Sequence, residues 1–345
     1  MLMLKVGILN VTGYAGSETV RILMRHPEVR ITSVTGRSAA GQKLGDVFPH
    51  LAELDLTIEP ELGDDVDFVV SALPHKVSAE AVAPLVRRGI RVVDISADFR
   101  LRSPQTYEEW YETPHPAPKL LEEAVYGLTE LHRAEVASAR LVANPGCYPT
   151  CIILGLYPAL KEGVIDGQII ADAKSGVSGA GRSLSLFTHF SEVNENVQAY
   201  GLKGHRHLPE ILQELEPVAG PNLAVTFVPH LIPMTRGILA TCYAPLKQNL
   251  GDPAAANRRL RELYLDYYGR EPFVKVASTP PQTKHTLGNN DCIVYPCVDH
   301  RTNRFIVVSC LDNLVKGAAG QAVQNMNVMF GFPETLGLEQ VALYP

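Results

Sequence analysis

One cysteine of this chain stands where a catalytic nucleophile would be expected. Cys147 lies in the stretch NPGCYPTCIILGL, behind the turn-forming Pro145 and Gly146 and in front of a long apolar run. Because a proline is tolerated in the first turn of a helix, Pro149 predicts that a helix starts at this cysteine. The dipole and free amides of a helix start stabilise a thiolate, lower the pKa of a thiol and could hold an oxyanion. We therefore expect Cys147 to be reactive at neutral pH.

Three of the other cysteines are expected to be structural. The chain has six cysteines and no CxxC pair, so the spacing predicts no metal site, and in a long intracellular chain we expect free thiols. Cys151 falls one turn beyond Cys147, inside the apolar run, and Cys242 and Cys310 lie within strand-like runs. These three are interpreted as small buried core residues.

A nucleophilic thiol usually has a base beside it, and two histidines are the candidates. Among eleven histidines, His205 and His207 form the tight pair, in GHRHLPEILQEL. Pro209 predicts that a helix begins there, so both histidines lie at a loop-to-helix junction rather than on an apolar face. One of the two could instead be a loop histidine held by hydrogen bonds, and the residues alone do not choose between them.

Two stretches have the composition of an anion site. The glycine-rich DAKSGVSGAGR offers hydroxyls, backbone amides and cations. Its cations are Lys174 and Arg182, and its hydroxyls are those of Ser175 and Ser178. Arg100 ends the predicted strand of DISADFR, where it would meet an anion at the carboxyl edge of a sheet. Either arginine could instead form a surface or interdomain ion pair.

A glycine turn near the start of the chain predicts a dinucleotide site. In GILNVTGYAGSE, Gly13 and Gly16 fall where a strand-to-helix turn needs a positive φ or a close backbone approach. The helix start beyond them would face a pyrophosphate. The strict GxGxxG is absent, because Asn10 and Val11 stand where a glycine is expected. A glycine turn without a ligand is therefore the alternative.

The residues after the second predicted strand favour NADP over NAD. NAD-binding folds place an acidic residue about 20 residues beyond the glycines. Arg37 stands there instead, with Ser38 beside it. A guanidinium and a hydroxyl suit a 2′-phosphate, and no carboxylate is there to repel it. Arg37 as a solvated surface residue is the alternative.

The elements that must position these residues change character along the chain. The first part predicts strands at residues 5–11, 29–35, 54–60, 67–73, 91–96 and 139–145, with helices at 17–26 and 78–89. Valine- and isoleucine-rich runs separated by helices predict a parallel sheet that is covered on both faces. The later part predicts strands at residues 167–175, 223–231, 237–246, 292–299 and 304–312. The last two form a hairpin, which favours a mixed or antiparallel sheet.

The chain closes with a predicted helix over residues 314–332. Its small residues Ala318, Ala319 and Gly320 would allow another segment to approach its backbone closely.

Length and charge limit the class of protein. A chain of 345 residues with 46% hydrophobic content predicts two domains, at about 100–200 residues each. A net charge of -6 points to neither a nucleic acid nor a membrane as partner. No apolar run approaches the ~18–20 residues of a membrane helix. The first strand-like run carries no signal-peptide cleavage site, so we expect a cytoplasmic protein.

Over essentially its whole length the chain resembles the N-acetyl-gamma-glutamyl-phosphate reductase family of the aspartate-semialdehyde dehydrogenase superfamily. The resemblance rests on TGYAGSE, SALPHKVS, DISADFR, YGLTEL, NPGCYPT, DAKSGVSGAGR, GHRHLPEI, PHLIPMTRGILATCY and LDNLVKGAAGQAVQN. It implies an α/β fold with a Rossmann-type parallel-sheet NADP-binding domain, residues 1–147 with 314–345. It also implies an α+β mixed-sheet catalytic and oligomerisation domain, residues 148–313.

The resemblance also implies site residues. NADP contacts are expected at Thr12, Gly13, Tyr14, Ala15, Gly16, Arg37, Ser38, Ser71, Leu73, Pro74, Ser178, Gly179 and Asn313. Substrate and phosphate contacts are expected at Arg100, Ser175, Arg182 and Arg206. Cys147 would be the nucleophile and His207 the acid–base group, with His205 as the less favoured candidate. Asn10 departs from the glycine usual in the family, which leaves the pyrophosphate contacts open.

The chemistry that the resemblance implies agrees with these residues. The Cys147 thiolate would attack an acyl phosphate and expel phosphate, and NADPH would reduce the resulting thioester to an aldehyde. The small-molecule substrate would be N-acetylglutamyl 5-phosphate, in arginine biosynthesis, and the protein a homo-oligomer, either a dimer or a tetramer.

Three other interpretations stay open. The same chemistry could act on an aminoadipyl phosphate carried by a small acidic protein in lysine synthesis. A cysteine hydrolase is a second alternative, although the dinucleotide turn argues against it. A nicotinamide-dinucleotide sensor without turnover is the third.

Overall fold

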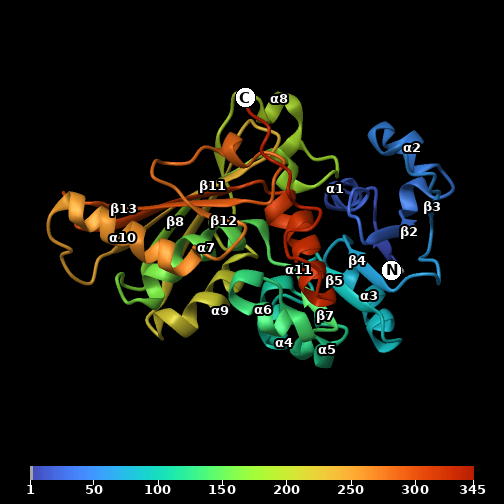
Figure 1. Ribbon diagram of the computed structural model, residues 1–345, viewed down its shortest axis with the longest axis horizontal. Helices are drawn as coiled ribbons and strands as arrows, with labels where there is room; N and C mark the ends of the chain where they lie inside the picture. Colours follow the sequence, from blue (N-terminus) through green and yellow to red (C-terminus); the bar gives the residue numbers. More distant parts are fainter. Residues whose placement is uncertain (1–2) are drawn as a thin grey trace. The chain divides into compact units, whose positions relative to one another are not determined.

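The computed structural model describes residues 3–345, which form two compact units, each with its own sheet (Figure 1). Unit 1 runs through Gly146 and resumes over Ala318–Gln340, and unit 2 comprises Cys147–Gly317 and Val341–Pro345. The chain therefore enters unit 2 at Cys147 and leaves it after Gly317. The functional domains expected from the sequence stay a prediction.

Unit 1 is built on a parallel sheet with the strand order β3-β2-β1-β4-β5-β7-β6. Its strands are β1 (Leu4–Leu9), β2 (Val29–Thr35), β3 (Ile58–Glu59), β4 (Phe68–Ser71), β5 (Arg91–Asp94), β6 (Val125–Tyr126) and β7 (Leu141–Ala143). The order reverses between β1 and β4, and doubly wound sheets bind ligands beyond the carboxyl ends of the strands at such a point. The predicted Rossmann-type sheet is confirmed.

The third strand is shorter than predicted. Of residues 54–60, only Ile58 and Glu59 pair with β2, at its carboxyl end. The residue before them, Thr57, forms an antiparallel bridge with Lys43 instead of pairing with β2.

Helices cover both faces of this sheet. They are α1 (Tyr14–Leu23), α2 (Leu44–Val47), α3 (Ser78–Arg87), α4 (Pro104–Tyr111), α5 (Pro118–Glu123), α6 (Thr129–Ser138) and α11 (Gly320–Phe330). Successive residues of β4 point to opposite faces. Phe68 packs edge-on against Phe330 of α11, with ring centroids 5.5 Å apart. Val69 instead belongs to the core cluster that contains Val82 and Leu85 of α3.

Unit 2 holds a mixed sheet with the order β12-β13-β14-β11-β8-β10-β9. Its strands are β8 (Gln168–Ser175), β9 (Gln198–Ala199), β10 (Ala224–Leu231), β11 (Ile238–Pro245), β12 (Val274–Val276), β13 (Cys292–Asp299) and β14 (Arg304–Leu311). Its helices are α7 (Cys147–Lys161), α8 (Phe190–Val193), α9 (Leu208–Ala219) and α10 (Pro253–Tyr268). The predicted hairpin is β13 and β14, which pair antiparallel. The helices α7 and α10 pack on one face of the sheet (Figure 1).

The predicted C-terminal helix is not one continuous α-helix. A π-turn spans Val315–Ala319, and only then does α11 begin. The hydrogen bond from the Gly317 amide to the Asp312 carbonyl, 2.9 Å, spans five residues, as a π-turn requires. The helix ends at Gly331, whose φ of 69° is the left-handed conformation that glycine adopts readily. No helix within residues 3–345 is long and apolar enough to cross a membrane.

The buried side chains of α11 are largely polar, and they bind the backbone of unit 1. Gln321 and Asn325 both donate to the Gly127 carbonyl, at 3.0 and 2.9 Å. Asn325 also donates to the side chain of Asn144, at 3.1 Å, and Asn144 donates to the Ala318 carbonyl at 3.0 Å. Because a buried carbonyl without a donor is costly, this helix completes unit 1 through hydrogen bonds as well as apolar contacts.

We expect Gly127→Ala to destabilise unit 1 by about 1–3 kcal/mol, the usual cost of overpacking a core. A Cβ at this position would lie 2.5 Å from both Asn325 Nδ2 and Val142 Cγ1. The midpoint of urea denaturation measures the loss. Gly63→Ala is the matched control, since its Cβ would meet only Ser33, no closer than 3.5 Å. Equal midpoints for the two variants would contradict the packing argument.

Candidate active site

Cys147 is the first residue of α7 and is partly buried. The rest of this helix is almost entirely buried, which explains its long apolar run. Cys151, one turn on, is fully buried and its thiol lies 3.3 Å from the Ser309 hydroxyl. Cys242 and Cys310 are also buried. The interpretation of these three as core residues is confirmed.

Two tyrosines interact electrostatically with Cys147, and the sequence reasoning did not single them out. Tyr148 is buried; it accepts a hydrogen bond from the Tyr200 hydroxyl at 3.1 Å and donates to the His230 carbonyl at 3.3 Å. Burial, with smaller contributions from Tyr200 and Cys147, raises the pKa of Tyr148 far above its usual value. Burial together with the charge of Cys147 raises the pKa of Tyr200 to about 12. Both phenols are therefore protonated donors at neutral pH.

The two histidines lie against these tyrosines, directly before α9. The rings of His205 and His207 are 4.8 Å apart, and their centroids lie 5.9 and 6.0 Å from that of Tyr148. The backbone amide of His207 donates to Nδ1 of His205 at 3.1 Å. Because an amide can only donate, this ring nitrogen carries no proton. Burial, with the nearby charge of Arg206, also lowers the pKa of His205 to about 4, so the ring is neutral.

Asn313 links the predicted anion loop to Gly237 through two hydrogen bonds of its side chain. Its segment Val177–Ala180 is a 3₁₀ turn in which the Ser178 hydroxyl accepts from Asn313 Nδ2 at 2.9 Å. Asn313 Oδ1 in turn accepts from the Gly237 amide at 2.7 Å. The sequence motifs of Ser178 and Asn313 are thus brought together, although 135 residues separate them.

The other predicted anion ligands differ in exposure. Ser175 is buried at the end of β8, while Gly179, Arg182 and Arg206 are exposed. Lys174 points to the opposite face of β8 from Ser175 and forms an ion pair with Asp172 at 2.7 Å. Among residues 3–345, no group of three or more His, Cys, Asp or Glu side chains gathers as a metal site would require.

In unit 1, the glycine turn departs from the expectation in one respect. The positive φ, 63°, falls on Asn10, while Gly13 has an extended φ of −80° as the N-cap of α1. Asparagine tolerates this conformation better than most residues. Its side chain donates to the Ala72 carbonyl at 2.8 Å and accepts from the Thr12 hydroxyl at 3.2 Å. Asn10 therefore replaces the usual glycine and also links the ends of β1 and β4.

Gly16 shows the close approach that was expected. A Cβ at this position would lie 2.3 Å from the Asn10 carbonyl oxygen, so only glycine fits while α1 packs this closely on the turn. Thr12, Ala15 and the 38% exposed Tyr14 lie beside it at the start of α1.

The remaining predicted cofactor residues follow β2 and β4. Arg37 and Ser38 are exposed in the short 3₁₀ turn after β2. Leu73 and Pro74 directly follow β4, at the point where the strand order reverses. Ser71 is different, because its side chain is fully buried and its hydroxyl is hydrogen-bonded to Ser78, 2.7 Å away.

Arg100 binds the backbone of unit 1. Its side chain is buried; Nε donates to the Asn144 carbonyl at 2.8 Å and Nη2 to the Ile95 carbonyl at 2.8 Å. These contacts fix the turn before Cys147, and an anion-binding role for Arg100 stays a prediction.

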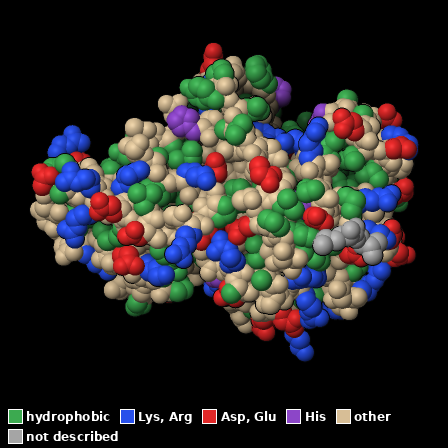
Figure 2. Space-filling model, viewed as in Figure 1, with side chains coloured by type: hydrophobic (Ala, Val, Ile, Leu, Met, Phe, Trp, Pro, Cys, Tyr) green, Lys and Arg blue, Asp and Glu red, His purple; other side chains and the backbone are tan. Residues whose placement is uncertain are grey.

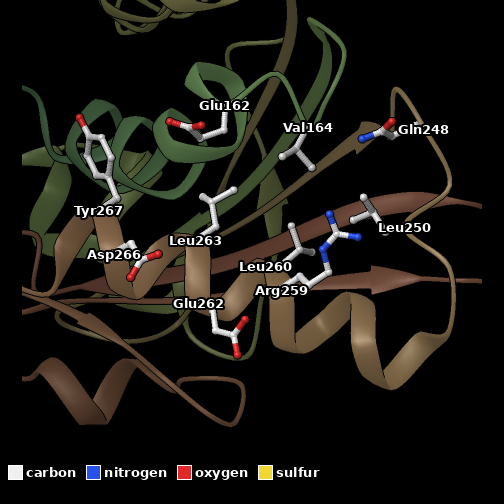
Figure 3. Close-up of a pocket in the computed structure, with 10 residues that line it drawn as sticks. All are labelled: Glu162, Val164, Gln248, Leu250, Arg259, Leu260, Glu262, Leu263, Asp266 and Tyr267. Carbon is white, nitrogen blue, oxygen red and sulfur yellow. The ribbon is translucent and has the colours of Figure 1, made fainter.

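A separate hollow of about 630 Å³ in unit 2 contains none of the predicted site residues (Figure 3). It lies beside α10, and its charged side chains are Glu162, Glu262, Asp266 and Arg259. Because carboxylates outnumber the single cation, this hollow is unsuited to a substrate with two negative groups. Acidic and basic side chains are also interspersed over the viewed face of each unit (Figure 2).

Comparisons with known proteins agree with this arrangement. Residues 5–139 match the sequence model of the semialdehyde dehydrogenase NAD binding domain, and residues 147–313 match that of the semialdehyde dehydrogenase dimerisation domain. In solved structures, the fold resembles aspartate semialdehyde dehydrogenase II of Vibrio cholerae, with a TM-score of 0.70 at 15% identity over 96% of this chain and 99% of that chain. It also resembles the Candida albicans enzyme, with a TM-score of 0.65 at 17% identity over 95% and 98%.

Closer relatives are found by sequence. The N-acetyl-gamma-glutamyl-phosphate reductase of Dehalococcoides mccartyi is 56% identical over 342 residues, 99% of each chain. The protein of the same name from Pelotomaculum thermopropionicum is 52% identical over 349 residues, again 99% of each. The chain therefore belongs to the N-acetyl-gamma-glutamyl-phosphate reductases of the semialdehyde dehydrogenase family.

Proposed function

We propose that this protein reduces N-acetylglutamyl 5-phosphate to N-acetylglutamate 5-semialdehyde with NADPH, releasing phosphate, as a step of arginine biosynthesis. The observation that carries the proposal is identity of 50–56% to reductases of this name, over nearly the whole length of each chain. The carrier-bound aminoadipyl substrate is not favoured by these relatives.

The residues of unit 1 fit a nicotinamide dinucleotide. Gly13, the N-cap of α1, has no side chain to occupy the first-turn amides, so these amides are suited to a pyrophosphate. Arg37 and Ser38 are exposed after β2 and suit a 2′-phosphate. Leu73 and Pro74 would line the same ligand beyond β4. When bound, NADPH supplies a hydride to an acyl carbon, and the protein's own residues prepare that carbon.

Cys147 prepares it by forming a covalent intermediate. Its thiolate attacks the acyl carbon, the bond from that carbon to the phosphate oxygen breaks, and phosphate leaves with the electron pair. The resulting thioester is a better hydride acceptor than a carboxylate. After reduction, the thiohemiacetal collapses to the aldehyde and the thiol is released. The start of α7 favours the thiolate during thioester formation. Its amides are suited to the oxyanion that forms both in this step and in the reduction.

His207 is the acid–base group in this proposal, and His205 positions it. The argument is the amide hydrogen bond from His207 to Nδ1 of His205, which occupies the nitrogen that a base would need. His205, with a pKa of about 4, also does not change protonation near neutral pH. His207 would take the proton of the thiol in the first half and return it to the sulfur as the carbon–sulfur bond breaks during collapse.

The negative groups of the substrate need cations and donors. Arg182 belongs to the predicted anion loop and Arg206 stands between the two histidines, and both are exposed. We assign them to the phosphate or the carboxylate of the substrate. Ser175 and Ser178 supply hydroxyls from the same loop, and Gly179 a backbone amide. We further propose that Arg100 binds the substrate and that Asn313 lies beside the nicotinamide.

The second sheet supports a homo-oligomer, either a dimer or a tetramer. One of its faces lies under α7 and α10, whereas the other carries partly exposed apolar residues, among them Ile170 at 44% exposure. Leu239, Tyr243 and Tyr295 share this face by alternation along β11 and β13. An apolar sheet face of this kind is typical of an interface between copies. We place the oligomer in the cytoplasm.

Cys147→Ser is expected to lower kcat by several orders of magnitude, because an alkoxide is a poor leaving group from the reduced intermediate. The affinity for NADPH, measured by fluorescence titration, should stay unchanged. Cys151→Ser is the matched control and should keep its activity, since Ser309 can pair with the new hydroxyl. Survival of half the activity in Cys147→Ser would remove this residue from the reaction.

Arg37→Asp is expected to shift the cofactor preference from NADPH toward NADH, because a carboxylate repels a 2′-phosphate and accepts from ribose hydroxyls. The ratio of kcat/KM for the two cofactors measures the shift. An unchanged ratio would exclude Arg37 from the cofactor site.

His207→Asn is expected to flatten one limb of the pH–rate profile, because the variant lacks the proposed acid–base group. His205→Asn should leave that limb in place, because the pKa of His205 is lowered to about 4. If His205→Asn removes the limb and His207→Asn does not, the two roles are exchanged.

A further inference from the structure

The backbone at Gly317 lies against Cys147 more closely than any side chain would allow. A Cβ built on Gly317 would be 2.7 Å from Cys147 Cβ and 3.2 Å from Cys147 Cα. It would also lie 3.3 Å from Leu311 Cδ1. Unstrained carbon–carbon contacts are about 3.5–4.0 Å, so any other residue would move Gly317 and Cys147 apart by ~1 Å.

The sequence reasoning expected a close approach, but placed it later in the same helix, at Ala318–Gly320. The π-turn accounts for the difference. It adds one residue to the helical turn and so changes which residue faces α7. Gly317 lies within this turn, and its amide closes the five-residue hydrogen bond.

Asp312 fastens the π-turn to the end of β14. Its side chain is fully buried, and Oδ1 accepts from the amides of Leu314 and Val315 at 2.8 and 3.3 Å. Its carbonyl accepts from the amides of Val315 and Gly317 at 3.2 and 2.9 Å. One residue therefore fixes the direction in which the chain leaves the strand.

The other oxygen of Asp312 binds the surroundings. Oδ2 accepts from the Gly288 amide at 2.8 Å and lies 3.5 Å from Nη1 of Arg236. A buried carboxylate is costly unless donors surround it, and here backbone amides and a guanidinium do so. The turn is thereby anchored to two neighbouring loops of unit 2 and does not move alone.

We propose that Asp312 is a positioning residue for the nucleophile, acting through the π-turn and the backbone of Gly317 to set the place of Cys147. This inference rests on the proposed function, in which Cys147 is the nucleophile. The contact with Gly317 limits the position of the Cys147 Cβ on one side, and Asp312 holds Gly317 in place. A displacement of ~1 Å at a reacting atom can cost about 10²-fold in rate.

The test compares kcat, the KM for substrate and the NADPH dissociation constant in single and double variants. Gly317→Ala should lower kcat by about 10²-fold, with the NADPH dissociation constant unchanged. Asp312→Ala should lower kcat less. Asp312→Asn should recover part of that loss, because its amide oxygen can still accept from Leu314 and Val315, while its amide nitrogen cannot accept from Gly288. The double variant Asp312→Ala, Gly317→Ala should be no slower than Gly317→Ala alone, since both act along one path.

Two matched controls separate positioning from loss of stability. Gly269→Ala creates a comparable overlap in unit 2, 2.5 Å from the Leu265 carbonyl oxygen, at the end of α10. Asp252→Ala removes another carboxylate that caps two backbone amides, those of Ala254 and Ala255. Both should lower the melting temperature and leave kcat per folded molecule unchanged.

Specific outcomes would overturn the proposal. They are full kcat in Gly317→Ala, an equal loss of kcat in Gly269→Ala, or no recovery in Asp312→Asn. Should Gly317→Ala fail to fold, the recovery of Asp312→Ala by Asp312→Asn decides alone. If the wild-type protein reduces no N-acetylglutamyl phosphate, the proposed function fails instead. The rate constant for alkylation of Cys147 by iodoacetamide then tests the positioning, and an equal rate constant in wild type and Asp312→Ala would overturn it.

Discussion

The residues at which the chain enters and leaves unit 2 are in contact, and much of the structure follows from that constraint. Cys147 opens the unit and Gly317 closes it, with no room for a side chain between them. The helix that begins at Cys147 is the core of the unit, because α7 packs against β11, β13, β14, α9 and α10. The candidate nucleophile is thus held by the segment that forms the core and by the segment that leads out of it.

The environment of the thiol is shaped by burial more than by charge. Tyr148, Tyr200 and His205 are uncharged near neutral pH, because burial raises the pKa values of the phenols and lowers that of the imidazole. A Cys147 thiolate would then be a negative group surrounded by uncharged hydrogen-bond donors. Uncharged, buried donors of this kind strengthen a hydrogen bond to a developing oxyanion, because the local dielectric constant is low.

The parts that were predictable from the sequence are those with local causes. Valine- and isoleucine-rich strands gave the parallel sheet, and the turn chemistry around Cys147 gave the start of α7. The short length of β3 was missed, because the chain before Ile58 pairs with Lys43 instead of β2, and a local pattern does not record that choice of partner. The π-turn was missed because its cause, Asp312, acts through hydrogen bonds that a helical hydrophobic pattern does not record.

In the candidate site, too, residues in local motifs were predictable from the sequence, whereas long-range contacts were not. Ser178 and Asn313 were predicted from motifs, and they are joined by a hydrogen bond that no local pattern contains. Tyr148 stands beside Cys147 in the sequence, which could have drawn attention to it, but Tyr200 has no such signal. Asn10 was noted as a departure from glycine, and its positive φ explains the departure without loss of the turn.

The late position of α11 has a consequence for the order of folding during synthesis. Unit 2 is one nearly continuous segment, Cys147–Gly317, and all of its sheet has been synthesised before α11 begins. Unit 1 is different, because Gln321 and Asn325 of α11 donate to its Gly127 carbonyl. Domains generally fold in the order in which they leave the ribosome, but here the first to emerge is completed last. Until α11 is made, nascent unit 1 exposes apolar side chains that lack their packing partner. It also exposes a carbonyl, that of Gly127, that lacks its hydrogen-bond donors.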